Sequence, residues 1–564
     1  MIARLYFLLA AALVGIAPAQ AKSPRVYTHG MVSAADGRAA EAGAEMLRQG
    51  GSATDAAIAT MLALTVVEPQ SSGIGGGGFY VRSDAAGRVE TIDGRETAPA
   101  AAHPKWFYTG GQALGPGQAV PGGTSVGVPG NIALAAKAHA AHGKLPWARL
   151  FAPAIRLAER GFVITPRLRT ALTASKRTAG FAGGARTFYT PAGEPLAIAT
   201  TVRNPALART LRQIARHGPR AFYSGTNAAA IVAAVTTAPR HPAPMMTSDL
   251  AAYRAQERGP VCGTYRAYRI CGMGPPSSGA TTVFATLKQL ERFDLGALGQ
   301  DSPVAWHLLA ESMRLAYADR ARYLADSDFV TVPVAGLIDP IYLAGRSALI
   351  DPGKTLALVT AGTPPGAERL SRADPAPAAE NGTSHFVAVD GLGHTVSYTS
   401  TIEGPFGSGL FVGGYYLNNE LTDFDMAPEQ DGRMVANRVE AGKRPRSSMA
   451  PTLVFAPDGK LRLAIGAAGG TTIPAQVAKA IIGVIDWELT AQQAIALPLI
   501  FAPTEVIGIE PGSRLEAMIP ALKALGHAQV VSRPMALKAN AVEVVGGRLI
   551  GAADPRSEGR SIGE

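Results

Sequence analysis

"NGTSHFVAVDG", residues 381–391, places a threonine directly after a glycine at the head of a predicted strand. The second half of this stretch is interpreted as a half-buried strand. A Pro- and Ala-rich segment of low hydrophobicity, residues 361–382, leads into it. Strands favour Val or Ile, but this one begins with Thr383, Ser384 and His385. The choice of these three residues therefore needs an explanation other than strand preference.

Thr383 has the surroundings of a nucleophile that cuts its own chain. Its hydroxyl follows a flexible glycine and can attack the carbonyl of Gly382, which leaves Thr383 as a new N-terminus. The freed α-amine, with an ordinary pKa near ~8 that falls on burial, then serves as the base. The chain has no His-Glu-x-x-His motif and no clustered Cys and His ligands. Residues 381–383 are also compatible with an ordinary turn or a glycosylation sequon.

The composition is that of a large globular chain. Its 564 residues are 47% hydrophobic and 17% charged, enough to bury an extensive core in one compact body or two tightly joined halves. The formal net charge is +10, but the 53 Lys and Arg residues are scattered and few aromatic residues accompany them. This pattern predicts a solvated basic surface and argues against nucleic acid as a partner.

Residues 1–21 have the pattern of a secretory signal peptide. Arg4 precedes an apolar stretch, residues 5–17, which is followed by the small-x-small sequence Ala19-Gln20-Ala21. The stretch is too short to span a bilayer comfortably, and a retained amphipathic anchor is the alternative. We expect removal after Ala21 and a periplasmic or secreted mature chain. No later segment approaches eighteen consecutive apolar residues, so no stable membrane span is expected.

The two cysteine residues lie in "GPVCGTYRAYRICGM", residues 259–273. A two-residue hairpin loop at Arg266-Ala267 would place Cys262 opposite Cys271 at a non-hydrogen-bonded position, where the strands approach most closely. The pattern predicts a disulfide formed in an oxidising compartment. Two buried free thiols are the alternative.

The first part of the chain is rich in helical patterns and the part after residue 382 is rich in strands. Helices are predicted at residues 33–49, 52–67 and 306–326. In "EPQSSGIGGGGFYV", residues 68–81, four glycines precede a strand instead of opening a helix, which favours a close backbone crossing over a dinucleotide loop. The ordinary interpretation of such a chain is two domains joined by a protease-sensitive linker at residues 361–382.

Eight ordered motifs extend this interpretation: "EPQSSGIGGGGF", "DGRETAP", "GTSHF", "YTSTIEGPFGSG", "LNNELTDF", "GKRPRSSMAPT", "GAAGGT" and "ADPRSEG". Through them the chain resembles the γ-glutamyltransferase family of N-terminal-nucleophile hydrolases over most of its length after the leader. The resemblance implies self-cleavage between Gly382 and Thr383 into a large subunit, residues 22–382, and a small subunit, residues 383–564. It also implies that the subunits interlock in one four-layer αββα sandwich.

The resemblance assigns a reaction and catalytic groups. Thr383 would attack the γ-carbonyl of a compound such as glutathione, and water or the amine of an amino acid or peptide would resolve the acyl-enzyme. The N–H groups of Gly469 and Gly470 match the oxyanion hole, and Thr401 matches the hydroxyl that holds the nucleophile's amine; a tight turn and an ordinary strand threonine are the alternatives. His385 is expected to pack or orient groups. No metal or organic cofactor is implied.

Charged residues match the glutamyl end of such a substrate. Arg95 would clamp the α-carboxylate, with Ser447 and Ser448 donating to it. Glu420 and Asp423 match the acids that receive the α-ammonium. A solvated loop is the alternative for that acidic pair.

Two positions depart from the family pattern. Glu403 stands where many members have Asn, and Arg446 where an apolar residue precedes the double serine. Because three carboxylates around one ammonium repel each other, Glu403 should be protonated or have its own cation, and we hypothesise a Glu403–Arg446 ion pair. Residues 424–443 are shorter than the family's substrate-covering loop and lack Tyr and Trp, which predicts a more open pocket and favours hydrolysis over transfer.

Two alternatives come from other functions of the same fold. A cephalosporin-acylase-like amidase would accept glutaryl amides, but the retained Asp423 would then be a buried acid without its ammonium partner. An unprocessed periplasmic binding or scaffold protein would have no use for Thr383, Thr401 and the Gly469-Gly470 pair.

Overall fold

The computed structural model describes residues 29–115, 117–370, 372–373 and 382–564. The expected leader, residues 1–21, and the centre of the predicted linker lie outside the described residues. Within these ranges, none of the helices combines the length and the apolar character needed to cross a bilayer.

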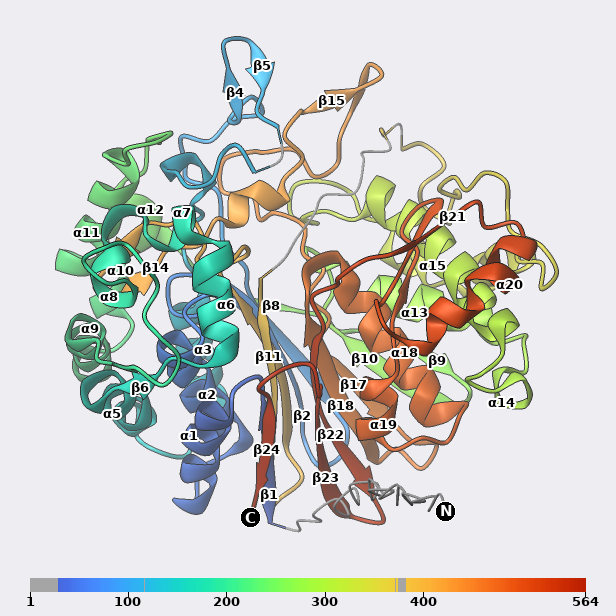
Figure 1. The fold of residues 1–564 in the computed structure, drawn as a ribbon, viewed down its shortest axis with the longest axis horizontal. Helices are drawn as coiled ribbons and strands as arrows, with labels where there is room; N and C mark the ends of the chain where they lie inside the picture. Colours follow the sequence, from blue (N-terminus) through green and yellow to red (C-terminus); the bar gives the residue numbers. More distant parts are fainter. Residues whose placement is uncertain (1–28, 116, 371, 374–381) are drawn as a thin grey trace, which may run out of the picture.

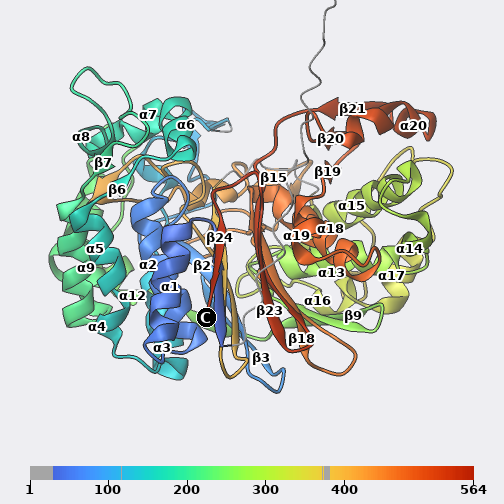
Figure 2. The ribbon, with the colours of Figure 1, turned by 60° about the horizontal axis from the view of Figure 1, so that its bottom comes forward.

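Two β-sheets pack face to face between two layers of helices (Figure 1, Figure 2). The first sheet has the strand order β24 (Arg560–Gly563), β1 (Gly30–Ala34), β11 (Ser384–Asp390), β12 (Thr395–Thr401), β2 (Gly77–Ser83), β3 (Val89–Gly94) and β8 (Gln256–Arg258). The second has the order β23 (Arg548–Ala553), β22 (Lys538–Val545), β18 (Leu461–Ala468), β17 (Thr452–Phe455), β10 (Tyr268–Gly272) and β9 (Val261–Tyr265). The expected four-layer αββα sandwich is confirmed.

Segments from both sides of Thr383 share each sheet. In the first sheet β11 lies between β1 and β12, so a strand from after Thr383 pairs with one from the start of the described chain. In the second sheet β10 pairs with β17. The helix-rich and strand-rich parts of the sequence therefore form one body, and the two-domain interpretation is wrong.

Helices α1 (Gly37–Arg48) and α2 (Ala53–Val67) cover the outer face of the first sheet. Asp36 caps α1, and Ser52 forms a capping box with Asp55 at the start of α2. Every residue of α2 is buried, as its nearly uniform apolar composition predicts. The first helix begins later than predicted because residues 30–34 pair as β1.

The remaining helices complete the two outer layers. On the side of α1 and α2 lie α3 (Asn131–His142), α5 (Ala152–Arg160), α6 (Pro166–Ala174), α9 (Pro205–His217) and α11 (Gly225–Thr236). On the second sheet lie α13 (Gly279–Leu290), α15 (Pro303–Tyr323), α18 (Ile473–Ile485) and α19 (Ala491–Ala496). The long helix expected at residues 306–326 is α15, shifted by three residues.

Strand β11 is buried on both of its faces rather than on one. Phe386 and Ala388 pack with the core beneath α1 and α2, whereas Val387 and Val389 pack into the core shared with the second sheet. The expectation of a half-buried strand is wrong because β11 lies inside the sandwich. Its first residues therefore enter an environment without bulk water.

The glycine run before β2 is a close backbone crossing, as predicted. A Cβ on Gly75 would lie 2.0 Å from the carbonyl oxygen of Tyr416, and a Cβ on Gly76 would lie 1.9 Å from that of Thr401. Only glycine fits at both positions. The run thus packs against the end of β12, where Thr401 is located.

The β9–β10 hairpin turns at Arg266 and Ala267, which both have positive φ, and pairs Cys262 with Cys271. A disulfide joins the two cysteines, whose Cα atoms are 4.2 Å apart. The turn and the pairing follow from a two-residue loop and the period of a strand.

Replacing both cysteines by serine should lower the free energy of unfolding by about 2–3 kcal/mol, the loop-entropy value for so short a closed loop. Denaturant titration of the variant and of the oxidised wild type would measure the difference. Wild type reduced before the titration is the control and should match the variant. Equal midpoints for oxidised and reduced wild type would contradict a stabilising disulfide.

Candidate active site

Thr383 lies at the entry to β11 in a strained backbone conformation. Its φ is +102°, a region that β-branched residues rarely occupy. Its N–H donates to the carbonyl of Ser71 at 3.0 Å, and its side-chain hydroxyl donates to Oγ1 of Thr401 at 3.1 Å. The side chain is held inside the protein, with the residue 5% exposed.

Gly382 allows this entry because no side chain fits at its position. A Cβ there would lie 1.3 Å from the carbonyl oxygen of Glu403. The peptide that links Gly382 to Thr383 is thus packed against the turn that follows β12. The glycine is required by packing as well as by its flexibility.

Thr401 ends β12 and is held in place by the chain that follows it. Its Oγ1 accepts the N–H of Glu403 at 2.8 Å as well as the hydroxyl of Thr383. Ile402 donates its N–H to the same Ser71 carbonyl that binds Thr383, at 3.3 Å. The carbonyl of Ser71 thus binds the backbone nitrogen of Thr383, and the end of β12 binds its hydroxyl.

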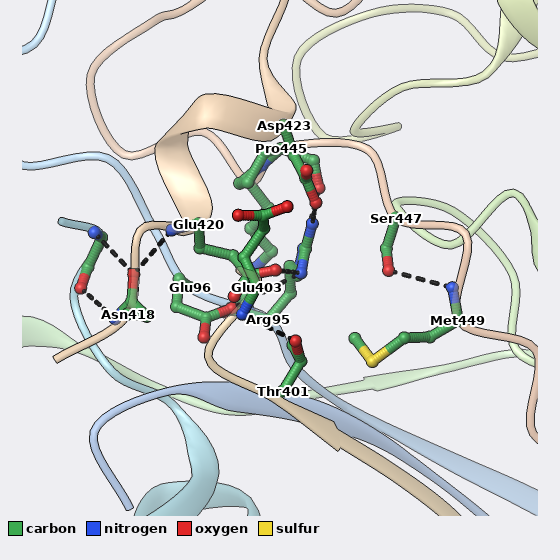
Figure 3. Close-up of polar contacts among 12 residues, drawn as sticks. Arg95, Glu96, Thr401, Glu403, Asn418, Glu420, Asp423, Pro445, Ser447 and Met449 are labelled. Atoms are coloured by element: carbon green, nitrogen blue, oxygen red, sulfur yellow. Dashed lines mark hydrogen bonds and ion pairs between the residues drawn. The ribbon is translucent and has the colours of Figure 1, made fainter. Parts of the chain in front are cut away.

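Arg95, which directly follows β3, is the centre of a buried charge cluster. Figure 3 shows Glu96, Glu403, Glu420 and Asp423 gathered around it. Nη1 of Arg95 donates to Glu420, and Nη2 donates to Asp423. The two acids are the first and last residues of the short helix η3 (Glu420–Asp423). Nε and Nη2 also donate to the carbonyls of Pro445 and Arg446, at 3.1 and 3.0 Å. The two predicted acids thus neutralise the predicted cation.

Glu96 belongs to this cluster and was not singled out from the sequence. It is fully buried, and its carboxylate lies 3.8 Å from Nη1 of Arg95. Burial raises the pKa of Glu96 to about 7, although Arg95 opposes the shift. Burial also raises the pKa of Glu420, and the nearby Glu96 and Glu403 add to that increase. Its place beside Arg95 in "DGRETAP" was the only signal in the sequence.

The cluster contains acceptors that no protein donor satisfies. Among the described residues, no Lys, Arg, amide or hydroxyl side chain donates to the carboxylate oxygens of Glu96 or to Oε2 of Glu420, and the two carboxyl groups are close enough to share a proton. Buried acceptors are normally satisfied, and unsatisfied ones mark a place where a donor can bind. A cationic group with several N–H donors has the matching chemistry.

Glu403 and Arg446 do not form the hypothesised ion pair. Across the described part of the chain, the Glu403 carboxylate accepts from Asn419, and no ion pair joins it to Arg446. Arg446 extends instead toward the end of α15, where it donates to the carbonyls of Ala321 and Leu324 at 3.3 and 3.4 Å. The pairing fails because the backbone at Arg446, not its side chain, faces Arg95.

Ser447 and Ser448 continue the chain from that backbone contact. Oγ of Ser447 accepts the N–H of Met449 at 3.2 Å (Figure 3), and Oγ of Ser448 accepts from Arg320. Both hydroxyls therefore already accept one hydrogen bond each.

Gly469 and Gly470 form the turn between β18 and the short helix that leads into α18. Both have positive φ, and a Cβ on Gly469 would lie 2.1 Å from the carbonyl of Ala536. The turn presents N–H groups at the N-terminal end of a helix, where the helix dipole favours negative charge. Because β18 packs on β11 across the sandwich, the turn is carried on the sheet that faces the strand of Thr383.

His385 is buried and neutral. Burial lowers its pKa to about 3, and its Nδ1 lies 2.8 Å from Oγ1 of Thr399. The ring also packs against Gly466, where a Cβ would come within 2.4 Å of it. These contacts agree with the expected packing role.

One set of possible metal ligands occurs among the described residues: His307, Glu311 and His527. Nδ1 of His307 and Nε2 of His527 are 2.7 Å apart, a hydrogen-bond distance. Two nitrogens bound to zinc at about 2.0–2.1 Å in a tetrahedral site would lie farther apart than this. The set is better described as a hydrogen-bonded histidine pair, and its three residues belong neither to the Arg95 cluster nor to the surroundings of Thr383.

Comparison with known proteins places this geometry in a family. The family described as gamma-glutamyltranspeptidase matches residues 39–564. This chain belongs to the gamma-glutamyltranspeptidase family. A glutathione hydrolase proenzyme of Bacillus subtilis (strain 168) is 39% identical over 485 residues, which cover 84% of this chain and 80% of that protein.

Relatives with another kind of name match the chain at a similar level. An acylase ACY 1 proenzyme of Pseudomonas sp. (strain SE83) is 36% identical over 550 residues, covering 96% of this chain and 94% of that protein. The crystal structure of a cephalosporin acylase from Bacillus halodurans superimposes with a TM-score of 0.85 at 26% identity and covers 99% of both chains. The N-terminal-nucleophile hydrolase fold is thus common to relatives with two kinds of name.

Proposed function

We propose that the protein is a self-processing γ-glutamyl hydrolase and transferase with Thr383 as its nucleophile. The observation that carries the proposal is the strained Gly382-Thr383 junction, in which the Thr383 hydroxyl is already hydrogen-bonded to Thr401 at 3.1 Å. Relatives named glutathione hydrolase proenzyme support both the reaction and the processing.

Self-cleavage needs only groups at that junction. Oγ1 of Thr383 attacks the carbonyl carbon of Gly382; the O–C bond forms, the C–N bond breaks, and the hydroxyl proton moves to the departing nitrogen. Water then hydrolyses the ester, which leaves a carboxylate on Gly382 and restores the hydroxyl. Breaking the peptide releases the strain stored at a positive φ.

In turnover the α-amine of Thr383 takes the hydroxyl proton as Oγ1 attacks the γ-carbonyl. The same amine then protonates the leaving amine, and water or an acceptor amine resolves the ester. The N–H groups of Gly469 and Gly470 would bind the oxyanion, where one donor is typically worth about 3–4 kcal/mol. Glycine at these positions lets the backbone approach the developing charge.

The glutamyl group would enter by exchanging ion pairs within the Arg95 cluster. Its α-ammonium offers Glu420 and Asp423 a new cation, and its α-carboxylate then takes their place on Arg95. One zwitterion leaves the total charge of the cluster unchanged, so the exchange does not leave a buried charge uncompensated. The unsatisfied oxygens of Glu96 and Glu420 supply further acceptors for the ammonium.

The purified protein tests the proposal directly. N-terminal sequencing of the small fragment should begin at Thr383, and the cut enzyme should release p-nitroaniline from γ-glutamyl-p-nitroanilide. A fragment that begins at any other residue, or a chain that stays uncut and inactive, would overturn the assignment.

Binding of the glutamyl group should weaken as the pH falls through about 7, because Glu96, whose pKa burial raises to about 7, must be ionised to accept the ammonium. The inhibition constant of L-glutamate, measured from pH 5 to 8, should rise by up to about tenfold per pH unit below 7. Glu96→Gln should bind more weakly and lose the part of this dependence that Glu96 contributes, while the raised pKa of Glu420 leaves a remainder.

The same raised pKa predicts a stability effect of opposite sign. Glu96 binds its proton more tightly in the folded state, so its ionisation costs stability as the pH rises from the unfolded pKa of about 4.5 through about 7. Glu96→Gln should therefore gain stability relative to wild type over that interval. A wild type and variant with identical pH dependence in both measurements would exclude this role for Glu96.

A glutaryl acylase is the second candidate, because relatives named acylase match the chain as fully as the glutathione hydrolases do. A glutaryl group lacks the ammonium and would leave Glu420 and Asp423 without a new cation. Rates on γ-glutamyl and glutaryl anilides separate the two candidates. A higher kcat/KM for the glutaryl compound would select the acylase.

The leader pattern and the disulfide support a periplasmic or secreted location. We include this location in the proposal. Fractionation of the producing cells, with the mature N-terminus expected at Lys22, would test it.

A further inference from the structure

Lys538, the first residue of β22, is a buried lysine that the proposed reaction does not use. Its Nζ lies 3.0 Å from Oε2 and 3.2 Å from Oε1 of Glu68, which caps the C-terminal end of α2. The two residues are 1% and 2% exposed. Burying two charges is costly unless their contacts are good, so a buried pair so close to the active site invites a functional explanation.

The pair is bound to both sides of the nucleophile. Nζ of Lys538 lies 3.3 Å from the hydroxyls of Ser71 and Ser384, and the Ser384 hydroxyl donates to Oε2 of Glu68 at 2.6 Å. Ser384 is the residue after Thr383, and the Ser71 carbonyl accepts the N–H of Thr383 at 3.0 Å. The pair therefore fixes both the strand that carries Thr383 and the carbonyl that binds its nitrogen.

Lys538 also reaches the turn that holds the two candidate oxyanion-hole glycines. It lies opposite Ala468 in the β18–β22 ladder, and its N–H donates to Gln476 at 3.2 Å. The Gln476 side-chain amide donates in turn to the carbonyl of Ala468 at 2.8 Å, directly before Gly469. One lysine thus connects the two parts of the proposed catalytic machinery.

We propose that Glu68 and Lys538 are positioning residues that orient the α-amine of Thr383 and keep the net charge beside it near zero. The inference rests on the proposed function, because that amine exists only after cleavage before Thr383. The carbonyl of Ser71, held by this network, accepts one hydrogen of the amine and so directs the nitrogen lone pair. A neutral pair leaves the amine free of a strong local field.

Other charged groups face the pair from neighbouring elements. Nε of Arg167 on α6 lies 4.0 Å from Oε1 of Glu68. At the start of α1, Arg38 interacts electrostatically with Glu68, and Asp36 interacts electrostatically with Lys538. Burial lowers the pKa of Lys538 to about 8, against the effect of Glu68. Lys538 and Arg167 lower the pKa of Glu68 despite its burial. Lys538 is therefore charged below about pH 8, and the lowered pKa of Glu68 keeps its carboxylate ionised at neutral pH.

Single neutralising variants should move the pKa of the amine in opposite directions. Lys538→Met leaves the carboxylate of Glu68 and should raise the pKa of the amine. Glu68→Gln leaves Lys538, whose own pKa falls further without Glu68, and should lower the pKa of the amine at the acid end of the profile, where Lys538 is positive. Arg167 partly offsets the first effect, so we expect shifts of about one unit or less. The double variant restores a neutral pair and should return the pKa close to that of wild type.

The experiment measures kcat on γ-glutamyl-p-nitroanilide from pH 5 to 9 with fully cut enzyme. The acid limb of the kcat–pH profile reports the pKa of the Thr383 amine in the enzyme–substrate complex. Two variants elsewhere in the protein serve as matched controls. Lys479→Met removes a buried lysine that donates to the carbonyls of Ile495 and Leu497. Glu543→Gln removes a buried glutamate that pairs with Arg462. Both controls should lose stability without moving the limb.

Opposite shifts in the single variants, cancelled in the double variant, would support the inference. Acid limbs that stay at the wild-type pH, or that move in the same direction in both single variants, would overturn the inference. If Lys538→Met does not fold, Glu68→Gln alone decides, because its limb must move to lower pH. A wild type that is uncut or starts elsewhere than Thr383 would instead refute the proposed function.

Discussion

A Thr383→Ala variant is expected to accumulate as one uncut chain and to lose at least about 10⁴-fold in kcat, as nucleophile replacements in enzymes of this kind do. In the proposed mechanism the same hydroxyl attacks Gly382 and the substrate. The free α-amine, which is the proposed base, would also never form. Gel electrophoresis and the anilide assay measure the two losses separately.

Two controls make this result specific. Thr383→Ser keeps a hydroxyl and should still be cut, at a reduced rate. Thr452→Ala removes a buried threonine hydroxyl on β17, which donates to the carbonyl of Ala450 at 3.0 Å, and should be cut and active. Two fragments and undiminished turnover from Thr383→Ala would refute the proposed nucleophile.

Replacing Arg95 by glutamine should reduce kcat/KM for γ-glutamyl substrates by about 10³-fold or more while self-cleavage continues. Removing one member of a buried ion pair typically costs about 3–5 kcal/mol because the remaining charge is uncompensated. Here Glu420 and Asp423 would lose their cation, and the substrate carboxylate would lose its binding group. Kinetics on correctly cut protein separate this loss from a processing defect.

Arg346 offers a matched control for Arg95. It is also buried and pairs with Asp319 at 3.2 Å on the far helical layer. Arg346→Gln should lower stability without a comparable loss in kcat/KM, and Arg95→Lys should recover only part of the activity because it lacks the planar fork. Activity within tenfold of wild type in Arg95→Gln would exclude Arg95 as the carboxylate-binding group.

Features that depend on neighbouring residues were predictable from the sequence. The capped, apolar segment at residues 52–67 predicted α2, and a two-residue turn set the register that places Cys262 opposite Cys271. The motif around Gly382 and Thr383 suggested the nucleophile that we propose, and the ordered motifs indicated the family and its sandwich fold. The helix and the turn depend on interactions among a few neighbouring residues. The family and its fold were indicated by the order of the motifs along the chain.

Only the tertiary structure brought distant groups together or kept them apart. Glu68 and Lys538 are 470 positions apart, and nothing local in either segment predicts their contact. Glu96 stood in a quoted motif, yet its raised pKa comes from burial among acids on other segments. Arg446 turns toward α15 instead of Glu403 because the packing of its backbone against Arg95 decides where its side chain points. Side-chain chemistry is written in the sequence, but burial and charge compensation depend on how the two sheets and their helices pack, which no short stretch contains.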